Sequence, residues 1–434
     1  MSRPSKKGTA TSVAPAKVAD EVAEENRGEN STRSETESGY QATSTPRRIQ
    51  QPPAETHYAG ELAFLRAIDS APRPRGWRLS PERVVDFICG SRGESIRAPA
   101  GAELPSEMPR SLILDPKFVG SRALVERCVV TLAGERGLLL VGQPGTAKSM
   151  LGELLAAAIS GSSGLAIQGT AGASEDHLRY GWNYAMLLDR GPRPEALVPS
   201  PVLVAMRTGS LVRVEEITRC LPEVQDSLIS VLSERRMIIP ELTGESGSIF
   251  AAPGFNVIAT ANLRDRGVSE MSAALKRRFN FETVAPIADA RQEMNLVGTR
   301  ATATLAETLG QPDKTPMVDT RLLEILVTAF RDLREGRTEE GWNVERPAAA
   351  MSTAEAVTVL TSIVRQGAFF PALKDPVSLL PGYLLGVVLK DNSEDRERLL
   401  AYWDGPVRRR GEADPLWKRM YELRAVLEEA GREL

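Results

Sequence analysis

Cysteine and histidine are scarce in this chain of 434 residues. It has three cysteines, Cys89, Cys128 and Cys220, and two histidines, His57 and His177. The cysteines are odd in number, lie far apart and form no C-x-x-C pair. This pattern excludes a disulfide scaffold and a zinc knuckle and favours a reducing compartment. Two histidines in separate segments also exclude a histidine-rich metal site.

Long apolar runs and a surplus of positive charge are missing as well. No segment approaches the about 18 uninterrupted apolar residues of a membrane-spanning helix. The first residues, MSRPSKKGTATS, lack the apolar region of a secretory signal. We therefore expect a cytoplasmic protein without a membrane partner. Lysine and arginine total 54 against 57 aspartate and glutamate residues, a net charge of −3, which excludes a nucleic-acid binder that works by bulk basicity.

The first 115 residues divide into two segments by composition. Residues 1–55 contain no leucine and one aromatic residue, Tyr40. Such a segment cannot bury enough apolar surface to offset the entropy of ordering, so it is predicted to be a disordered tail. Residues 56–115 are predicted to be an accessory region packed against the main domain. Helical periodicity at 61–68, and Ser80 as an N-cap before a proline, predict two helices there.

The rest of the chain changes from mixed to all-helical periodicity. Residues 116–288 alternate short apolar runs with helical segments, which predicts an α/β domain with a parallel sheet covered on both faces. The expected strands are at 138–141, 165–168, 211–214, 255–260 and, as a short fifth candidate, 283–287. Residues 289–434 are predicted to be an all-helical lid domain with C-terminal helices. Its helices are expected at 321–333, at 353–365 after a capping box of Ser352 and Glu355, and at 416–429.

The sharpest motif follows the first expected strand. GQPGTAKS lies between an apolar strand and an Ala/Leu-rich helix, the context that a phosphate-binding P-loop requires. Loop amides and the helix N-terminus would face phosphate oxygens. Lys148 would reach the β- and γ-phosphates and Ser149 would bind Mg²⁺, so the predicted ligands are ATP and Mg²⁺. The predicted binding residues are Gly142, Gly145, Thr146, Ala147, Lys148 and Ser149, with Ala147 in the place of the usual glycine.

An acidic pair ends the third expected strand, in LVRVEEITR. After a P-loop, such a pair suggests a Walker B motif, in which Glu215 holds Mg²⁺ through water and Glu216 polarises the attacking water. The first acid is usually aspartate, and glutamate is one methylene longer, so the metal geometry is the weakest part of this assignment. Arg213 inside the strand is unusual, and the sequence offers no account of it.

Two further features complete the candidate site. Asn262 ends the buried strand of FNVIATAN and could hold the lytic water near the γ-phosphate, or could be a capping residue. Arg277 and Arg278 precede Phe279 and could reach a neighbouring subunit's γ-phosphate as an arginine finger, or could be an ordinary solvated cluster.

GQPGTAKS, VEEITRCLPEVQDSLISVLSERR, FNVIATAN and ALKRRF occur in the order seen in AAA+ ATPases. The sequence most closely resembles MoxR-type proteins, whose P-loop has alanine before the lysine. The resemblance covers roughly residues 117–390. It implies the same roles for the P-loop, the acid pair and Asn262 as sensor 1, and it favours Arg278 as the finger because that residue directly precedes the phenylalanine. At the usual position of the sensor 2 arginine the chain has Ala354, which leaves Arg346 as a guess for that role.

The resemblance also implies an assembly and partners. Proteins of this kind usually form homo-oligomeric hexameric rings with ATP at subunit interfaces, and MoxR-like proteins often remodel a protein client that has a von Willebrand factor A domain. Tyr180, Trp182 and Tyr184 alternate as strand residues on one face would. They could contact a client, although packing of a hairpin within the domain is favoured.

The leading hypothesis is therefore an ATP-driven remodeler or chaperone of a protein partner. A McrB-like nucleotide-dependent DNA-processing motor shares a similar sensor region. A metal-chelatase motor subunit pairs such an ATPase with a von Willebrand-type partner. A nucleotide-gated scaffold with little hydrolysis is motivated by Glu215 and by the missing sensor 2 arginine.

Overall fold

The computed structural model of the chain describes residues 51–101, 104–262, 268–309, 318–370, 375–390, 392 and 394–430. The predicted tail covers residues 1–55, of which residues 1–50 lie outside the described residues. At its end the first helix, α1 (Ala54–His57), begins.

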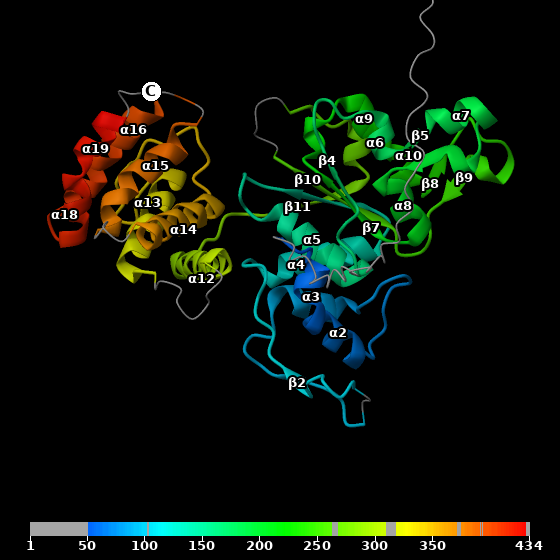
Figure 1. Cartoon of the computed structure of the whole chain (residues 1–434), viewed down its shortest axis with the longest axis horizontal. Helices are drawn as coiled ribbons and strands as arrows, with labels where there is room; N and C mark the ends of the chain where they lie inside the picture. The colour runs from blue at the N-terminus through cyan, green and yellow to red at the C-terminus, as the bar shows by residue number, and fades with distance from the viewer. Residues whose placement is uncertain are drawn as a thin grey trace, which may run out of the picture. The chain divides into compact units, whose positions relative to one another are not determined.

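A five-stranded sheet forms the centre of the α/β domain (Figure 1). Its order is β11–β3–β10–β7–β4, and every neighbouring pair is parallel. The strands β3 and β10 are buried along their whole length; β3 is an uninterrupted apolar run, whereas β10 also contains Asn256 and Thr260. The predicted α/β fold with a parallel sheet is confirmed. The strands are β3 (Gly137–Val141), β4 (Ala166–Gln168), β7 (Leu211–Glu215), β10 (Asn256–Ala261) and β11 (Phe279–Thr283).

The fifth strand differs from the prediction. It covers Phe279–Thr283, whereas the apolar run suggested 283–287. As an edge strand, β11 alternates between buried and more exposed residues, so its sequence FNFET is not continuously apolar. The chain after it contains Pro286, which has no N–H for a sheet hydrogen bond, and this apolar run lines a pocket instead.

Helices cover both faces of this sheet. On one face Leu138 and Leu140 of β3 pack in a core with α3 (Pro81–Cys89), α4 (Arg122–Ala133) and α5 (Lys148–Ser160). On the other face Leu139 and Val141 pack with α8 (Pro201–Thr208), α9 (Pro222–Asp226) and α10 (Leu228–Ser233). Residues of α1 and of α2 (Ala59–Ile68) join the first core, so this part of the N-terminal region packs into the α/β domain.

Short hairpins project from the α/β domain. They pair β1 (Ile96–Arg97) with β2 (Ser111–Leu112), β5 (Tyr180–Trp182) with β6 (Leu197–Pro199), and β8 (Arg236–Ile238) with β9 (Ser248–Phe250). The helices α6 (Glu175–Leu178) and α7 (Tyr184–Arg190) flank β5, and α11 (Ala273–Lys276) precedes β11.

The three alternating aromatic residues do not share one face. Tyr180 is buried, with its hydroxyl bonded to Glu241, and Trp182 packs against the core of the domain. Tyr184 begins α7 and is 69% exposed. Packing within the domain therefore describes Tyr180 and, in part, the partly buried Trp182, whereas Tyr184 is the exposed one of the three.

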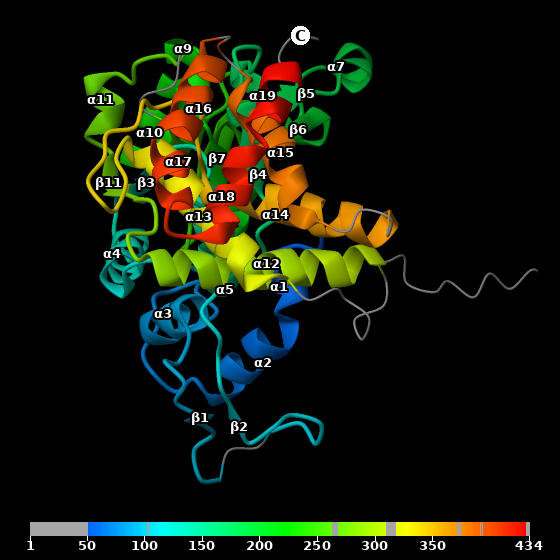
Figure 2. The same cartoon turned by 90° about the vertical axis from the view of Figure 1, so that its left-hand side faces the viewer.

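The C-terminal helices form a separate hydrophobic core. The first of them, α12, packs against both α13 and α14 (Figure 2). The predicted capping box is present at the start of α14, and the expected helix at 416–429 is divided at Leu423. No helix in the described ranges is long and apolar enough to cross a membrane. The helices are α12 (Ala290–Leu309), α13 (Thr320–Glu335), α14 (Thr353–Phe369), α15 (Leu380–Val388), α16 (Asp395–Tyr402), α17 (Arg408–Gly411), α18 (Pro415–Glu422) and α19 (Arg424–Ala430).

Candidate nucleotide-binding site

The loop between β3 and α5 turns through two left-handed residues. Gly145 has φ +74°, which glycine adopts without steric cost. Ala147 has φ +65° and is the N-cap of α5, a conformation that costs about 1–2 kcal/mol for a residue with a Cβ. The turn places the loop directly before the positive end of a thirteen-residue helix. The predicted P-loop thus has the strand, loop and helix that phosphate binding requires.

Lys148 lies inside this loop. Its side chain is buried, and Nζ donates to the carbonyl oxygens of Gly142 at 3.1 Å and Gln143 at 2.8 Å. Thr146 Oγ1 also donates to the Gln143 carbonyl, at 2.9 Å. The ammonium group is therefore held where phosphate oxygens would meet it.

Glu215 joins the P-loop helix to the sheet. Its Oε2 accepts hydrogen bonds from Ser149 Oγ at 2.7 Å and from Thr260 Oγ1 at 2.8 Å. Its Oε1 accepts from Arg213 Nη1 at 2.7 Å. Arg213 Nη2 also donates to the Ser163 carbonyl, so the unexplained arginine of β7 fixes the buried carboxylate and balances its charge.

The residues predicted to hold Mg²⁺ fit that ion. Mg²⁺ accepts a hydroxyl oxygen as a ligand and keeps several water ligands, and a carboxylate beside that hydroxyl can accept hydrogen bonds from such waters. Ser149 Oγ and Glu215 Oε2 are 2.7 Å apart. The longer side chain of glutamate thus still brings its oxygen to the predicted serine.

Glu216 occupies a strained turn next to Glu215. It has φ +51°, an uncommon value for a residue with a side chain. Its N–H donates to Thr260 Oγ1 at 2.9 Å, and its carboxylate pairs with Arg219 Nε at 2.5 Å. The Glu216 side chain is 35% exposed, so solvent reaches this carboxylate while the neighbouring one is enclosed.

Thr260 is a functional candidate that the sequence reasoning missed. One hydroxyl accepts from the Glu216 backbone and donates to the Glu215 carboxylate. It is buried at the end of β10, the strand next to β7 in the sheet. A threonine two residues before Asn262, on the same expected strand end, was the available signal.

Asn262 directly follows β10 and is buried. Its Oδ1 has no hydrogen-bond partner in the part of the chain that the structure describes. A buried polar atom without a partner is uncommon and calls for a ligand or water. This environment suits the predicted contact with a water molecule.

Arg277 and Arg278 lie at the other end of the sheet. The carbonyl of Arg278 accepts from the N–H of Gly137, the first residue of β3, whereas the P-loop follows the last residue of that strand. Five strand residues span about 17 Å, so neither arginine reaches the P-loop of its own chain. Arg278 donates to Ser233 Oγ and to the Ala274 carbonyl. Arg277 is exposed and forms no side-chain hydrogen bond or ion pair with described residues.

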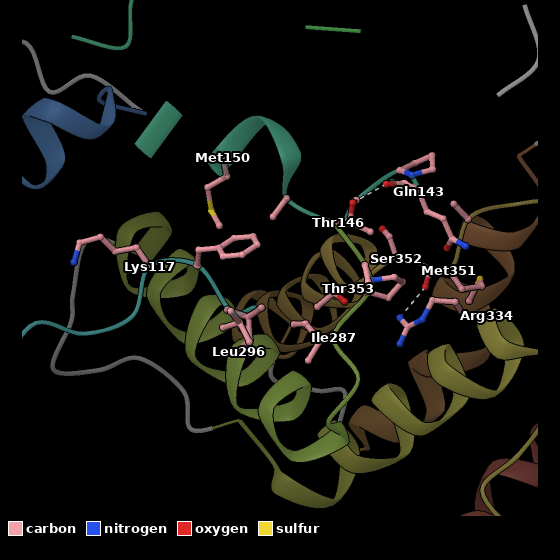
Figure 3. Close-up of a pocket in the computed structure, with 18 residues that line it drawn as sticks. Lys117, Gln143, Thr146, Met150, Ile287, Leu296, Arg334, Met351, Ser352 and Thr353 are labelled. Atoms are coloured by element: carbon pink, nitrogen blue, oxygen red, sulfur yellow. Dashed lines mark hydrogen bonds between the residues drawn. The ribbon is translucent and has the colours of Figure 1, made fainter. Parts of the chain in front are cut away.

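A pocket beside the P-loop has three walls (Figure 3). One consists of loop residues 143–147, and an apolar wall includes Phe118, Met150, Ile287 and, from α12 of the helical domain, Leu296. The third wall, also from the helical domain, consists of Arg334 and residues 350–353. Figure 3 shows Arg334 on the side of Gln143 and Thr146, with Lys117 and Leu296 towards the other end. The pocket combines an apolar region with a phosphate loop, as a nucleotide requires.

The helical domain approaches the loop closely at Ser352. A Cβ placed on Gly145 would lie 2.3 Å from Ser352 Cβ, so this glycine is needed for contact as well as for its backbone conformation. Arg346, the guess for sensor 2, does not line the pocket; its guanidinium donates to the Glu335 carbonyl. The arginine that lines it is Arg334, which the sequence reasoning did not single out.

Two family models match the chain. Residues 137–279 match the AAA domain of the dynein-related subfamily, and residues 291–428 match the YehL-like AAA+ ATPase C-terminal domain. The uncharacterized protein YehL of Escherichia coli strain K12 is 48% identical over 377 residues, which cover 87% of this chain and 97% of that protein. The chain belongs to the YehL family of AAA+ ATPases.

Two further similarities are shorter or more distant than that to YehL. The uncharacterized protein SH1500 of Staphylococcus haemolyticus is 35% identical over 144 residues, which cover 33% of this chain and 53% of that protein. The crystal structure of NtrX from Brucella abortus in complex with ADP covers 58% of this chain and 51% of NtrX, with 13% identity and a TM-score of 0.38. The resemblance to AAA+ ATPases is confirmed, and the closer resemblance to MoxR-type proteins stays a prediction.

Proposed function

We propose that this YehL-family chain binds ATP with Mg²⁺ at the P-loop and hydrolyses it to ADP and phosphate in an assembled ring. The observation that supports this most is the connected set of Ser149, Glu215, Thr260 and Glu216 beside the P-loop. It combines a hydroxyl ligand for Mg²⁺ and a carboxylate beside it, which would hold the ion through water, with a solvent-accessible carboxylate one residue further on.

Each of these side chains has a role in the proposed mechanism. Lys148 binds the β- and γ-phosphates, and Ser149 and Glu215 hold the ion, which when bound neutralises phosphate charge. Glu216 orients the attacking water and takes its proton. Asn262 accepts a hydrogen bond from that water through its unpartnered Oδ1. The charge that develops on the phosphoryl oxygens is stabilised by Lys148 and by an arginine from elsewhere.

That arginine would come from a neighbouring copy. Arg277 and Arg278 lie at the opposite end of the sheet from their own P-loop, so a ring in which copies meet head to tail would bring them to the next P-loop. We propose such a homo-oligomer, with six subunits as the MoxR resemblance implies. The structure leaves Arg277 the more available of the two, since Arg278 binds its own domain.

The work done with this energy is proposed from the resemblance. A MoxR-like ATPase would remodel or activate a protein partner, with a von Willebrand factor A domain protein as the first partner to test. The sequence-derived alternatives are a McrB-like motor and a chelatase subunit. A comparison of ATP with GTP turnover separates the McrB-like motor from the others.

Turnover measured over a protein-concentration series tests the proposal. Specific ATPase activity is expected to rise with concentration and to disappear in Glu216→Gln. Glu223→Gln, an exposed glutamate of α9, is the matched control and should retain activity. Turnover that survives Glu216→Gln would remove that residue from the proposed role.

A second function is favoured by the ion pair between Glu216 and Arg219. Arg219 competes with a water molecule for the Glu216 carboxylate, which fits a scaffold that binds ATP and hydrolyses little. In that case the wild type binds ATP but shows no more turnover than Glu216→Gln. The Arg219→Gln variant likewise shows no increase in turnover. Activation by Arg219→Gln would favour the enzyme.

A further inference from the structure

The first helix of the described chain is attached to the P-loop helix. α1 packs against α5 (Figure 2). The N–H of Ala54 donates to Glu153 Oε1 of α5 at 2.9 Å, and Ala54 is buried in the core that the two helices share. α1 lies well before residue 137, where the match to the AAA domain begins. An element outside that domain therefore contacts the helix that begins with Lys148.

Glu55 of α1 holds the loop between α5 and β4. Its Oε1 accepts a hydrogen bond from the Ser163 N–H at 3.0 Å, and its Oε2 accepts one from Ser163 Oγ at 2.7 Å. Burial raises the pKa of Glu55, but the bonds from Ser163 outweigh it and keep the pKa below its usual value, so the carboxylate is ionised. Hydrogen bonds to an ionised acceptor are the stronger class. Ser163 is itself buried, so the loop is firmly held at this residue.

The loop has little else to fix it at Ser163. Residues 161–165 connect α5 with β4, and glycines lie on both sides of the serine pair. Gly161 has φ +76°, and such residues leave the backbone free to take several conformations. The two bonds to Glu55 therefore decide where the Ser163 peptide and its carbonyl lie.

The Ser163 carbonyl in turn holds the guanidinium of Arg213. It accepts from Nη2 at 3.1 Å and from Nε at 3.4 Å, while Nη1 donates to Glu215 Oε1 at 2.7 Å. The donors of a guanidinium have a fixed, planar arrangement. A shift of the carbonyl on one side of Arg213 is therefore passed to the carboxylate on the other side, whose second oxygen accepts from Ser149 Oγ.

We propose that Glu55 and Ser163 are positioning residues for Glu215, through which α1 sets how firmly the site binds the Mg²⁺ of an ATP complex. This inference rests on the proposed ATP site. Without Glu55 the loop is released, and Arg213 keeps its bond to Glu215 but loses its second anchor. The carboxylate then takes up more positions, and fewer of them suit a water ligand of the ion.

Isothermal titration of the full chain with a non-hydrolysable ATP analogue, in Mg²⁺ and again in EDTA, tests this inference. The ratio of the two affinities measures what the ion contributes to binding. Direct partners of metal ligands typically contribute about tenfold or more to metal affinity. Glu55 acts through Ser163 and Arg213, so Glu55→Ala should lower the ratio by about fivefold. Glu55→Gln keeps the length and one acceptor and should recover most of the ratio, and Ser163→Ala, which loses only the hydroxyl bond, should lower it less than Glu55→Ala.

The matched control is Asp69→Ala. Asp69 is a carboxylate of the accessory region that accepts from the Ser80 N–H at 2.6 Å, and it forms no hydrogen bond to Arg213 or Ser163 among the described residues. It should lower the urea midpoint, as Glu55→Ala does, and leave the ratio unchanged.

The outcomes separate the inference from the proposed function. If Glu55→Ala leaves the ratio unchanged, or if Asp69→Ala lowers it equally, the inference is wrong and Glu55 only anchors α1. If Glu55→Ala does not fold, an unchanged ratio in Ser163→Ala and Glu55→Gln alike overturns it. If the wild type binds no analogue, or binds it equally in EDTA, the proposed ATP and Mg²⁺ site fails, and the wild type alone shows this.

Discussion

Replacement of Thr260 by valine tests the reasoning about the acid pair. Valine keeps the shape of threonine but removes the hydroxyl that donates to Glu215 and accepts from the Glu216 N–H. The bond to the carboxylate is worth about 1.5–3 kcal/mol and the bond from the backbone about 0.5–1.5 kcal/mol. We expect the free energy of unfolding to fall by about 2–4 kcal/mol, since both partners are left in a buried position.

The effect on turnover should be separable from that on stability. Without the hydroxyl, Glu216 loses a contact that holds its left-handed backbone, and a positioning loss of about 1.4 kcal/mol lowers the rate constant tenfold. We therefore expect kcat for ATP to fall by at least about tenfold at temperatures where the variant is folded. Urea unfolding and steady-state turnover measure the two effects.

Thr361→Val is the matched control for this variant. Thr361 is equally a buried threonine, and its hydroxyl donates to the Val357 carbonyl within α14, far along the chain from the acid pair. This control should lose about 1 kcal/mol of stability and keep its turnover. If Thr260→Val behaves like Thr361→Val, the hydroxyl at β10 does not position Glu216.

Three further perturbations follow from the same structure. Glu293→Ala leaves two lid arginines without their carboxylate and should destabilise the protein by about 3–5 kcal/mol in urea unfolding. Gly145→Ala places a methyl group against Ser352 in a left-handed turn and should abolish ATP binding measured by titration, whereas a helix-surface substitution should not. Burial raises the pKa of Cys128 to about 12 and that of Cys89 to about 11, so at pH 8 both thiols stay protonated. They should resist iodoacetamide in the native state and react after unfolding, as mass spectrometry would show.

Much of the fold could be predicted because periodicity and burial coincide. The strand β3 is a continuous apolar run, β10 is mostly apolar, and both are buried along their whole length. The edge strand β11 was misplaced because its outward residues are polar or exposed, so no apolar run marks it. The helix break at Leu423 has no proline or glycine to signal it, since tertiary packing decides the division.

The site residues could be predicted where a residue type in a motif has a single chemical role. The P-loop lysine and the acid pair were visible from motif and position. Thr260 was not, because only the pairing of β10 with β7 brings it to Glu215. Arg213 lies two residues before Glu215 on β7, and its role became clear only from the bonds of its guanidinium to that carboxylate and to the Ser163 carbonyl. Arg334 could not be predicted for a similar reason. It lies near the C-terminal end of α13, and only the packing of the lid helices brings it to the pocket.

The neighbours of Glu215 explain how a glutamate can occupy the position of the usual aspartate. A longer carboxylate at the end of β7 loses its fixed position unless both oxygens are held. Glu215 has one oxygen fixed by Arg213 and the other by two hydroxyls, of which one belongs to the P-loop helix. Arginine inside the strand and glutamate at its end are therefore one arrangement, in which the charge that orients the carboxylate also makes its burial tolerable. Arg213→Met should therefore impair the site, even though Arg213 lies away from the phosphates. Glu215→Asp alone should not restore the usual geometry, because the shorter side chain would no longer span the same partners.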